Sequence, residues 1–260
     1  MTSPLRVPDG AVRYILYQRT AYQRVARWIC PDLLGRAFPR PRHWAIRLES
    51  RLRRSAVKSR YGEEMQREFH ALRPHLPSTC RGVLDIGCGV AGIDALVSRF
   101  YEHEPELYLL DRTVIERSVF YMFREHGAFY NSLEVARDVL VANGVDNSRI
   151  HLLEAGRDRP LAQSVDLALS LISWGFHYPV STYLDAVWSA LRPGGKVLLD
   201  IRAGTDGLAQ LAERFSSIEV IMTTRKQSRV IATKGEPARS HPDGASDIRL
   251  QTAGRCRTCR

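Results

Sequence analysis

The chain has 260 residues, with 44% hydrophobic and 8% aromatic side chains, which is typical of a soluble globular protein. This length suffices for one large α/β domain with an appendage. No apolar run approaches the roughly 18–20 residues that a membrane span needs, and the N-terminus lacks the apolar core of a secretory signal. We therefore expect a cytoplasmic protein.

The five cysteines are too few and too scattered for a disulfide framework. They are Cys30, Cys80, Cys88, Cys256 and Cys259. The last two form a lone C-x-x-C pair, whereas a tetrahedral zinc site needs four ligands. We therefore expect no metal site.

The formal net charge of +10 is unevenly distributed along the chain. Residues 1–60 hold 14 Lys/Arg against 3 Asp/Glu, residues 61–224 hold 15 against 22, and residues 225–260 hold 9 against 3. The acidic centre argues against a nucleic-acid cleft through the core. The basic ends permit peripheral contact with a membrane surface or another polyanion.

Residues 10–30 mix apolar and arginine positions at helical spacing, and a second basic helix is expected over residues 43–58. The apolar positions of the first helix are Val12, Ile15, Leu16, Tyr22, Val25 and Ile29. One interpretation is an interfacial anchor at a lipid headgroup layer. The other is a helical pair that packs on the main domain with its arginines solvated. A further helix over residues 60–69 carries Arg60 and Tyr61, which are candidate cofactor contacts unless this segment is a simple linking helix.

Residues 83–92 predict a short buried strand, a glycine turn and the start of a helix. Gly87, Gly89 and Gly92 have the G-x-G-x-x-G spacing, in which glycines let the backbone approach a ligand and helix N–H groups face an anion. Glycines also mark ordinary tight turns. Asp85 narrows the choice, because a carboxylate before the first glycine would repel a pyrophosphate. S-adenosylmethionine has no phosphate and carries an ammonium and a sulfonium, so the pattern favours this methyl donor over a nicotinamide cofactor.

Residues 106–111 form the second expected strand, which ends in Asp111, 22 residues after Gly89. A carboxylate at this position can accept the ribose hydroxyls of an adenosine, although turn capping is the structural alternative. Residues 112–130 are rich in aromatic side chains. They form either a loop over the ligand or a helix packed into the core.

The third expected strand, residues 149–154, follows a helix over residues 132–143. Its last residue, Glu154, is placed to accept the adenine amino group, with Asp158 as a rival. A continuous apolar strand over residues 164–172 leads into residues 173–179, at the edge where ligands bind in open sheets.

The rest of the chain predicts a helix over residues 180–191, a turn, a strand over residues 197–201 and a helix over residues 206–214. Strands over residues 218–222 and 230–233 then form a hairpin, so the final strand inserts antiparallel. The composition after residue 236 indicates a disordered tail.

Residues 82–234 together resemble the class I S-adenosylmethionine-dependent methyltransferases. The resemblance rests on residues 83–89, Asp111, the strand over residues 165–170, the Leu-Arg-Pro-Gly-Gly turn at 191–195 and the closing hairpin. It implies an α/β, Rossmann-like, doubly wound seven-stranded sheet with order 3-2-1-4-5-7-6, strand 7 antiparallel. The expected layout is a basic helical extension (1–60), a methyltransferase domain (61–235) and a basic tail (236–260). The expected cofactor contacts are Tyr61, Asp85, Gly87, Cys88, Gly89, Asp111, Arg112, Glu154 and Ser170.

The acceptor is expected to carry a hydroxyl or carboxyl group, because neither an Asn/Asp-Pro-Pro-Tyr motif nor a Pro-Cys nucleophile is present. Residues 174–178 are similar to bacterial methyltransferases of sugar and glycan biosynthesis, which implies methyl transfer to a sugar hydroxyl. His177 is the candidate general base, and a packed or capping histidine is the alternative. An RNA methyltransferase, a non-catalytic donor-binding subunit and a nicotinamide enzyme are the competing hypotheses. The acceptor itself and the oligomeric state are not determined by the sequence.

Overall fold

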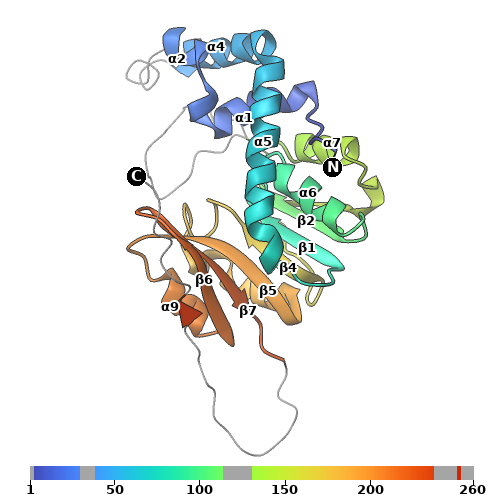
Figure 1. Cartoon of the computed structure of the whole chain (residues 1–260), viewed down its shortest axis with the longest axis vertical. Coiled ribbons are helices and arrows are strands. Elements are labelled where there is room, and N and C mark those ends of the chain that lie inside the picture. Colours follow the sequence, from blue (N-terminus) through green and yellow to red (C-terminus); the bar gives the residue numbers. More distant parts are fainter. Residues whose placement is uncertain (1–2, 30–38, 114–130, 237–250, 253–260) are drawn as a thin grey trace, which may run out of the picture. The chain divides into compact units, whose positions relative to one another are not determined.

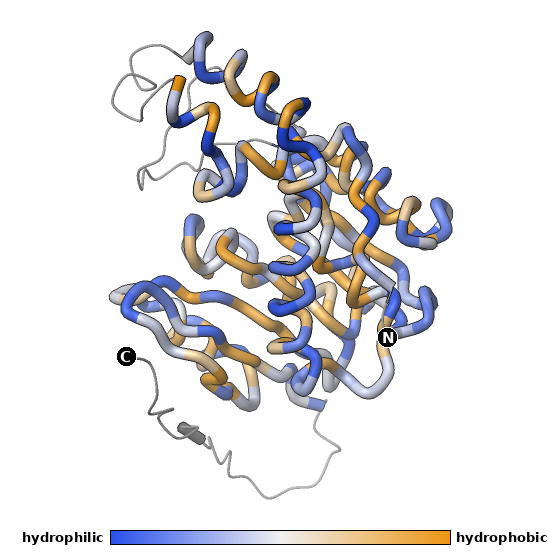
Figure 2. The backbone as a smooth tube through the Cα atoms, turned by 45° about the horizontal axis from the view of Figure 1, so that its top comes forward, coloured by the Kyte–Doolittle hydropathy of each residue, from blue (hydrophilic) through white to orange (hydrophobic). Residues whose placement is uncertain are grey.

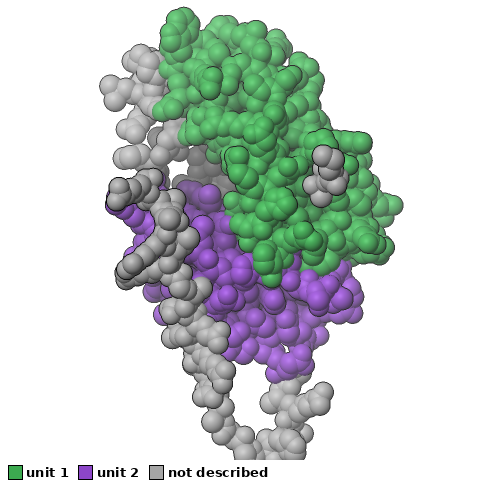
Figure 3. Space-filling model, viewed as in Figure 1, with its two compact units in different colours: residues 1–74, 87–158 green, residues 75–86, 159–260 purple. Residues whose placement is uncertain are grey.

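The computed structural model describes residues 3–29, 39–113, 131–236 and 251–252. The chain divides into two compact units (Figure 3). Residues 1–74 and 87–158 form unit 1, and residues 75–86 and 159–260 form unit 2.

The strands have the order β3-β2-β1-β4-β5-β7-β6-β8 (Figure 1). Pairing is parallel for β1 with β4, β2 with β3 and β4 with β5, whereas β7 runs antiparallel to both β5 and β6. The strand bounds are β1 (Gly82–Ile86), β2 (Glu106–Asp111), β3 (Ile150–Glu154), β4 (Val165–Ser170), β5 (Leu191–Arg202), β6 (Ser217–Thr223), β7 (Gln227–Thr233) and β8 (Gln251–Thr252). The predicted seven-stranded order and the antiparallel closing hairpin are confirmed.

The short strand β8 lies in the segment for which a disordered tail was expected. It pairs parallel to β6 through Gln251 and Thr252. The other residues after Glu236, including Cys256 and Cys259, lie outside the described part of the chain.

Unit 1 contains most of the helices. They are α1 (Val12–Gln18), α2 (Val25–Ile29), α4 (Pro39–Leu52), α5 (Arg54–Leu72), α6 (Gly92–Phe100) and α7 (Leu133–Ala142). Figure 2 shows that α5 is largely hydrophilic, whereas α4 alternates hydrophobic and hydrophilic residues. Within the described residues, no helix combines the length and the hydrophobicity that a membrane span requires.

The N-terminal helices differ in their bounds from the prediction. The helix expected over residues 10–30 is divided into α1 and α2, and the one expected over residues 43–58 ends at Leu52. The carboxylate of Glu49 is the physical reason for the first division, because it accepts hydrogen bonds from the backbone N–H groups of Arg24 (2.8 Å) and Ala26 (2.9 Å) at the start of α2. Arg53 pairs with the same carboxylate and with the carbonyl of Tyr22, and its backbone leaves the helical region. The expected domain boundary at residue 60 consequently falls inside α5.

The expected apolar face of the N-terminal helices is largely buried. Val12, Ile15 and Leu16 have no exposed surface, and Tyr22 is 2% exposed. Burial of such side chains contributes about 1.5–3 kcal/mol each. This face is therefore part of the core of unit 1.

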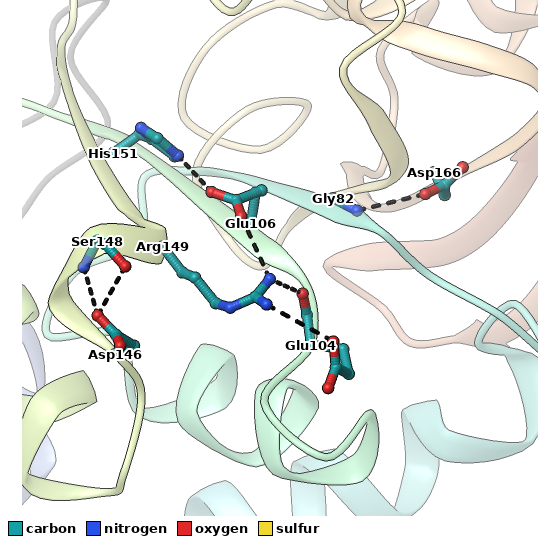
Figure 4. Close-up of polar contacts among 8 residues, drawn as sticks. All are labelled: Gly82, Glu104, Glu106, Asp146, Ser148, Arg149, His151 and Asp166. Atoms are coloured by element: carbon teal, nitrogen blue, oxygen red, sulfur yellow. Dashed lines mark hydrogen bonds and ion pairs between the residues drawn. The ribbon is translucent and has the colours of Figure 1, made fainter.

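The paired strands β2 and β3 of unit 1 carry a partly exposed charge network (Figure 4). Arg149 donates to the carbonyl of Glu104 and pairs with Glu106 (3.3 Å), which also contacts His151 Nε2 (2.7 Å). Exposed pairs of this kind contribute about 0–1 kcal/mol. They connect the start of β3 to the start of β2 without determining the fold.

Unit 2 contains α8 (Leu184–Ala190), α9 (Gly207–Ala212) and the strands of the hairpin. The turn expected at residues 191–196 is part of β5. Val165 lies opposite Leu191 and Leu167 opposite Lys196, so the intervening residues bulge out of the ladder. The bulge allows Pro193 to lie within a strand that is otherwise continuously paired.

A buried ion pair connects β5 and β7 in unit 2. Arg229 donates to Asp200 through Nε (2.7 Å) and Nη2 (2.9 Å), and the two side chains are 7% and 0% exposed. The two residues lie directly opposite each other in the antiparallel ladder. Because both charges are desolvated, removing either side chain would leave the other as a buried charge without a counter-ion.

We predict that Arg229→Met lowers the free energy of unfolding by about 3–5 kcal/mol, because Asp200 would remain buried without its cation. Urea denaturation measures this loss. Arg214→Met is the matched control, since Arg214 and Asp185 form an exposed pair in the same unit and its loss costs about 0–1 kcal/mol. Equal effects of the two substitutions would contradict the prediction.

Candidate functional site

The turn after β1 has the backbone conformation that its glycines allow. Gly87 and Gly89 have φ angles of 79° and 57°, and Ala91 follows at 54°. The N–H of Gly87 donates to the carbonyl of Leu110 near the end of β2 (2.7 Å). A left-handed backbone is strained for residues with a Cβ, so the glycines are needed to bring the turn against β2.

The carboxylate of Asp111 organises this turn. Its Oδ2 accepts hydrogen bonds from the N–H of Gly89 (3.0 Å) and from Nδ2 of Asn131 (2.8 Å), while Oδ1 accepts from the N–H of Arg112 (2.7 Å). The expected cofactor contacts Gly89, Asp111 and Arg112 are thus together in unit 1. Arg112 joins the cluster through its backbone N–H group.

Asn131 and Gln18 extend the same cluster, and neither was anticipated from the sequence. Asn131 is 4% exposed, and its Oδ1 accepts from Nε2 of Gln18 at 3.4 Å. A Cβ on Gly89 would lie 2.8 Å from Oε1 of Gln18, which is too close for a normal contact. The end of α1 therefore packs directly on the glycine turn.

Cys88 lies among the same groups and is 8% exposed. Its sulfur is 4.0 Å from both Oδ2 of Asp111 and Nδ2 of Asn131. Cys88 is therefore enclosed by the turn, where a small side chain fits.

The surroundings raise the pKa of Asp111 to about 6. Desolvation is the largest cause, and the hydrogen bonds from Arg112, Gly89 and Asn131 oppose it. Further hydrogen-bond donors from a ligand would stabilise the ionised form of this desolvated carboxylate.

Tyr61 belongs to α5, and its hydroxyl contacts Gly92 at the start of α6. It is 3% exposed, and a Cβ on Gly92 would lie 2.2 Å from its hydroxyl oxygen. Arg19 stacks on the Tyr61 ring (5.3 Å), and burial raises the pKa of the phenol. Arg60 does not join this group, because it stacks on Tyr22 (4.2 Å) and donates to the carbonyl of Ala21.

Glu154 lies opposite Asp111 in the ladder between β2 and β3. Its Oε1 accepts from the N–H of Thr113 (3.2 Å). The rival carboxylate, Asp158, accepts from the N–H of Glu154 (2.8 Å), and its pairing with Arg157 lowers its pKa. Asp158 therefore serves the turn after β3, while Glu154 lies at the strand end beside Asp111.

The other expected site residues belong to unit 2. Asp85 is 3% exposed and lies near the end of β1, two residues before Gly87. Ser170 has no exposed surface, since its hydroxyl donates to the carbonyl of Ile86 (2.6 Å) and accepts from the N–H of Trp174 (2.9 Å). This position makes Ser170 a connection between β1 and the segment after β4.

His177 belongs to a tightly folded segment after β4. The carbonyl of Ser173 accepts its N–H (2.8 Å), and the ring packs edge-on against Phe176. His177 is exposed, yet desolvation by its neighbours lowers its pKa, and the charge of Arg202 adds to this effect. The lowered pKa favours the neutral imidazole, which is the form that a general base needs.

Ile172, in the same segment, has a φ of 67° and is 49% exposed. A left-handed conformation costs a β-branched residue about 1–3 kcal/mol, and such strain is frequent at functional sites. Within the described residues, no group of three or more His, Cys, Asp or Glu side chains has an arrangement suited to a metal ion. The aromatic segment expected to cover the ligand lies outside the described residues beyond Thr113.

No protein-family model matches the sequence, and no curated protein matches it. Solved structures with similar folds include a methyltransferase from Pyrococcus furiosus (17% identity, TM-score 0.45, 66% of this chain and 83% of that one). A precorrin-6y C5,15-methyltransferase from Geobacter metallireducens GS-15 has 18% identity and a TM-score of 0.45, over 67% of this chain and 89% of that one. A SAM-dependent O-methyltransferase from Thermotoga maritima has 16% identity and a TM-score of 0.45, over 68% of this chain and 67% of that one. At this distance, only the residues of the chain itself can indicate its function.

We predict that Asp111 makes the stability of the protein depend on pH. The folded chain retains this proton up to about pH 6 and the unfolded chain only to about pH 4. The contribution of Asp111 to the free energy of unfolding therefore falls between these pH values, by about 3 kcal/mol at most. Urea denaturation of wild type and Asp111→Asn at pH 4 and 7 measures the difference. Parallel pH profiles would contradict the assignment.

Proposed function

We propose that the chain is an S-adenosylmethionine-dependent methyltransferase whose acceptor is a hydroxyl of a sugar, glycan or related small molecule. The proposal combines the strand order, the glycine turn and the acids that end β1 and β2. The acidic central part of the chain favours a small-molecule acceptor over a nucleic acid.

The observation that carries the choice of cofactor is the buried carboxylate of Asp85, two residues before Gly87. A dinucleotide would bring a doubly anionic pyrophosphate to this glycine turn, and a nearby carboxylate would repel it. Asp111 does not distinguish the two cofactors, because an acid at the end of β2 accepts the ribose hydroxyls of either adenosine. A methyl donor without phosphates and with a cationic methionine end therefore suits the turn better than a nicotinamide dinucleotide.

The donor set fits S-adenosylmethionine. Asp111 would accept its ribose hydroxyls, Glu154 would accept the adenine amino group, and Asp85 would attract the positive charge of its methionine end. Gly87 and Cys88 would line the turn, and Tyr61 of α5 would contact the carboxylate of the donor. When bound, the cofactor supplies a methyl group activated by a sulfonium.

His177 is the proposed proton acceptor for the acceptor hydroxyl. Its backbone is fixed by the hydrogen bond to Ser173 in the segment after β4, at the carboxyl end of a parallel strand, and its lowered pKa favours the neutral ring. A positioned general base accelerates such a reaction about 10²–10⁴-fold. Without a base, the proton would have to leave to water.

We predict that the isolated chain binds S-adenosylhomocysteine and not NAD in isothermal titration calorimetry. Ribose hydroxyls stabilise the ionised form of Asp111, so binding releases a proton and weakens as the pH falls below about 6. Asp111→Asn should bind at least about tenfold more weakly, the equivalent of 1.4 kcal/mol, and should lose the pH dependence. Arg137→Gln, at an exposed pair on α7, is the control and should bind as wild type. Tighter binding of NAD would overturn the choice of cofactor.

We predict that His177→Ala lowers turnover about 10²-fold or more with little change in donor affinity. Production of S-adenosylhomocysteine, measured with a panel of sugar and glycan acceptors, provides the readout. The acidic limb of the rate profile should lie below pH 6.5, because the pKa of His177 is lowered, and should disappear in the variant. Unchanged turnover would exclude His177 as the base. Absence of any turnover by the wild-type chain, with donor binding intact, would indicate instead a donor-binding subunit without catalysis.

A further inference from the structure

The N-terminal helices α2 and α4 present a surface that the fold does not use. We define the Trp-Arg face as Arg24, Trp28, Trp44, Arg47, Arg51 and Leu52. Trp28 is 84% exposed, Trp44 60% and Leu52 67%. Tryptophan is rarely so exposed when it serves only the core of a protein.

The inner side of α4 is separate from this face. Arg42, Ala45, Ile46 and Glu49 are at most 1% exposed, and their i, i+3, i+4, i+7 spacing places them on one side of the helix. At about 3.6 residues per turn, positions 44, 47 and 51 fall on the opposite side. The exposed tryptophan and arginines of α4 therefore point away from the core of unit 1.

The charges of this face are available to an external partner. The described acids of this region are used internally, since Glu49 binds Arg53 and the start of α2, while Asp9 pairs with Arg54 and Lys58. Among the residues that the structure describes, Arg24, Arg47 and Arg51 form no ion pair. Their positive charge is thus directed outward and uncompensated.

The combination of exposed tryptophan, leucine and unpaired arginine suits one kind of partner best. Tryptophan and arginine are typical of helices that lie at the headgroup layer of a membrane, with apolar side chains below and cations beside anionic phosphates. A nucleic acid would use the arginines but has no place for Leu52. Protein interfaces are also enriched in tryptophan and arginine, but the net positive charge of this face is better matched by the anionic surface of a membrane.

We propose that α2 and α4 bind the surface of an anionic phospholipid membrane through the Trp-Arg face. The helices lie flat on the bilayer, Trp28 and Trp44 enter the headgroup layer, and the arginines contact lipid phosphates. This proposal is independent of the methyltransferase assignment, because its readout is binding and not turnover.

The test is co-sedimentation of the full chain with vesicles of equal parts phosphatidylglycerol and phosphatidylcholine, compared with phosphatidylcholine alone. We expect at least tenfold tighter partition to the anionic vesicles at low salt, and a weakening as the ionic strength rises, because exposed charges are screened. Tryptophan emission should shift to the blue on binding. The shift should be lost in Trp28→Phe/Trp44→Phe, since the two remaining tryptophans belong to unit 2, where Trp174 is buried and Trp188 packs against Phe215.

Two variants separate the face from the net charge. Arg47→Glu/Arg51→Glu should lower partition at least tenfold, and Trp28→Ala/Trp44→Ala should do so with the charge unchanged. Arg225→Glu/Lys226→Glu makes the same charge change at the exposed turn between β6 and β7 and should retain partition within about twofold. Circular dichroism verifies that each variant is folded.

Failure to bind the anionic vesicles would overturn the proposal. Equal loss in the Arg225→Glu/Lys226→Glu control would also overturn it, because binding would then follow net charge alone. Tighter binding to single-stranded RNA than to the vesicles at the same ionic strength would assign the face to a nucleic acid instead.

Discussion

The hydrogen bond from the N–H of Gly89 to the carboxylate of Asp111 is the interaction on which the candidate site depends. It closes the glycine turn onto the end of β2. Asn131 and the N–H of Arg112 donate further hydrogen bonds to the same carboxylate. The bond needs a left-handed backbone at Gly89, where a Cβ would also displace the end of the Gln18 side chain. The backbone conformation of Gly89, its packing against Gln18 and its hydrogen bond to Asp111 therefore depend on one another.

The same constraint connects structure to function. Desolvation makes ionised Asp111 costly, and hydroxyl donors from a ligand would offset this cost. Under the proposed function, the ribose of the cofactor supplies these donors. The proposed acceptor site is the segment around His177, whose backbone is held by Ser173 and in which Ile172 has a left-handed conformation.

The sequence predicted what depends on local patterns. Alternating and continuous apolar runs located the strands, and the acids at the ends of β1 and β2 marked the candidate site by their positions in the chain alone. What it did not predict depends on contacts between distant residues. Glu49 divides the N-terminal helices by binding Arg24, Ala26 and Arg53, and Gln18 and Asn131 reach the turn from remote segments. Neither Gln18 nor Asn131 belongs to a recognisable motif, so only the folded chain brings them together.

The pKa of Asp111 is the quantity that tests the proposed cofactor site most directly. The ¹³C chemical shift of its carboxyl group, followed by NMR with and without S-adenosylhomocysteine, reports the pKa directly. If Asp111 accepts the ribose hydroxyls, its pKa falls from about 6 to well below that value when the ligand binds. A pKa that stays the same or rises would show that the ribose is held elsewhere and would remove the basis for the proposed cofactor.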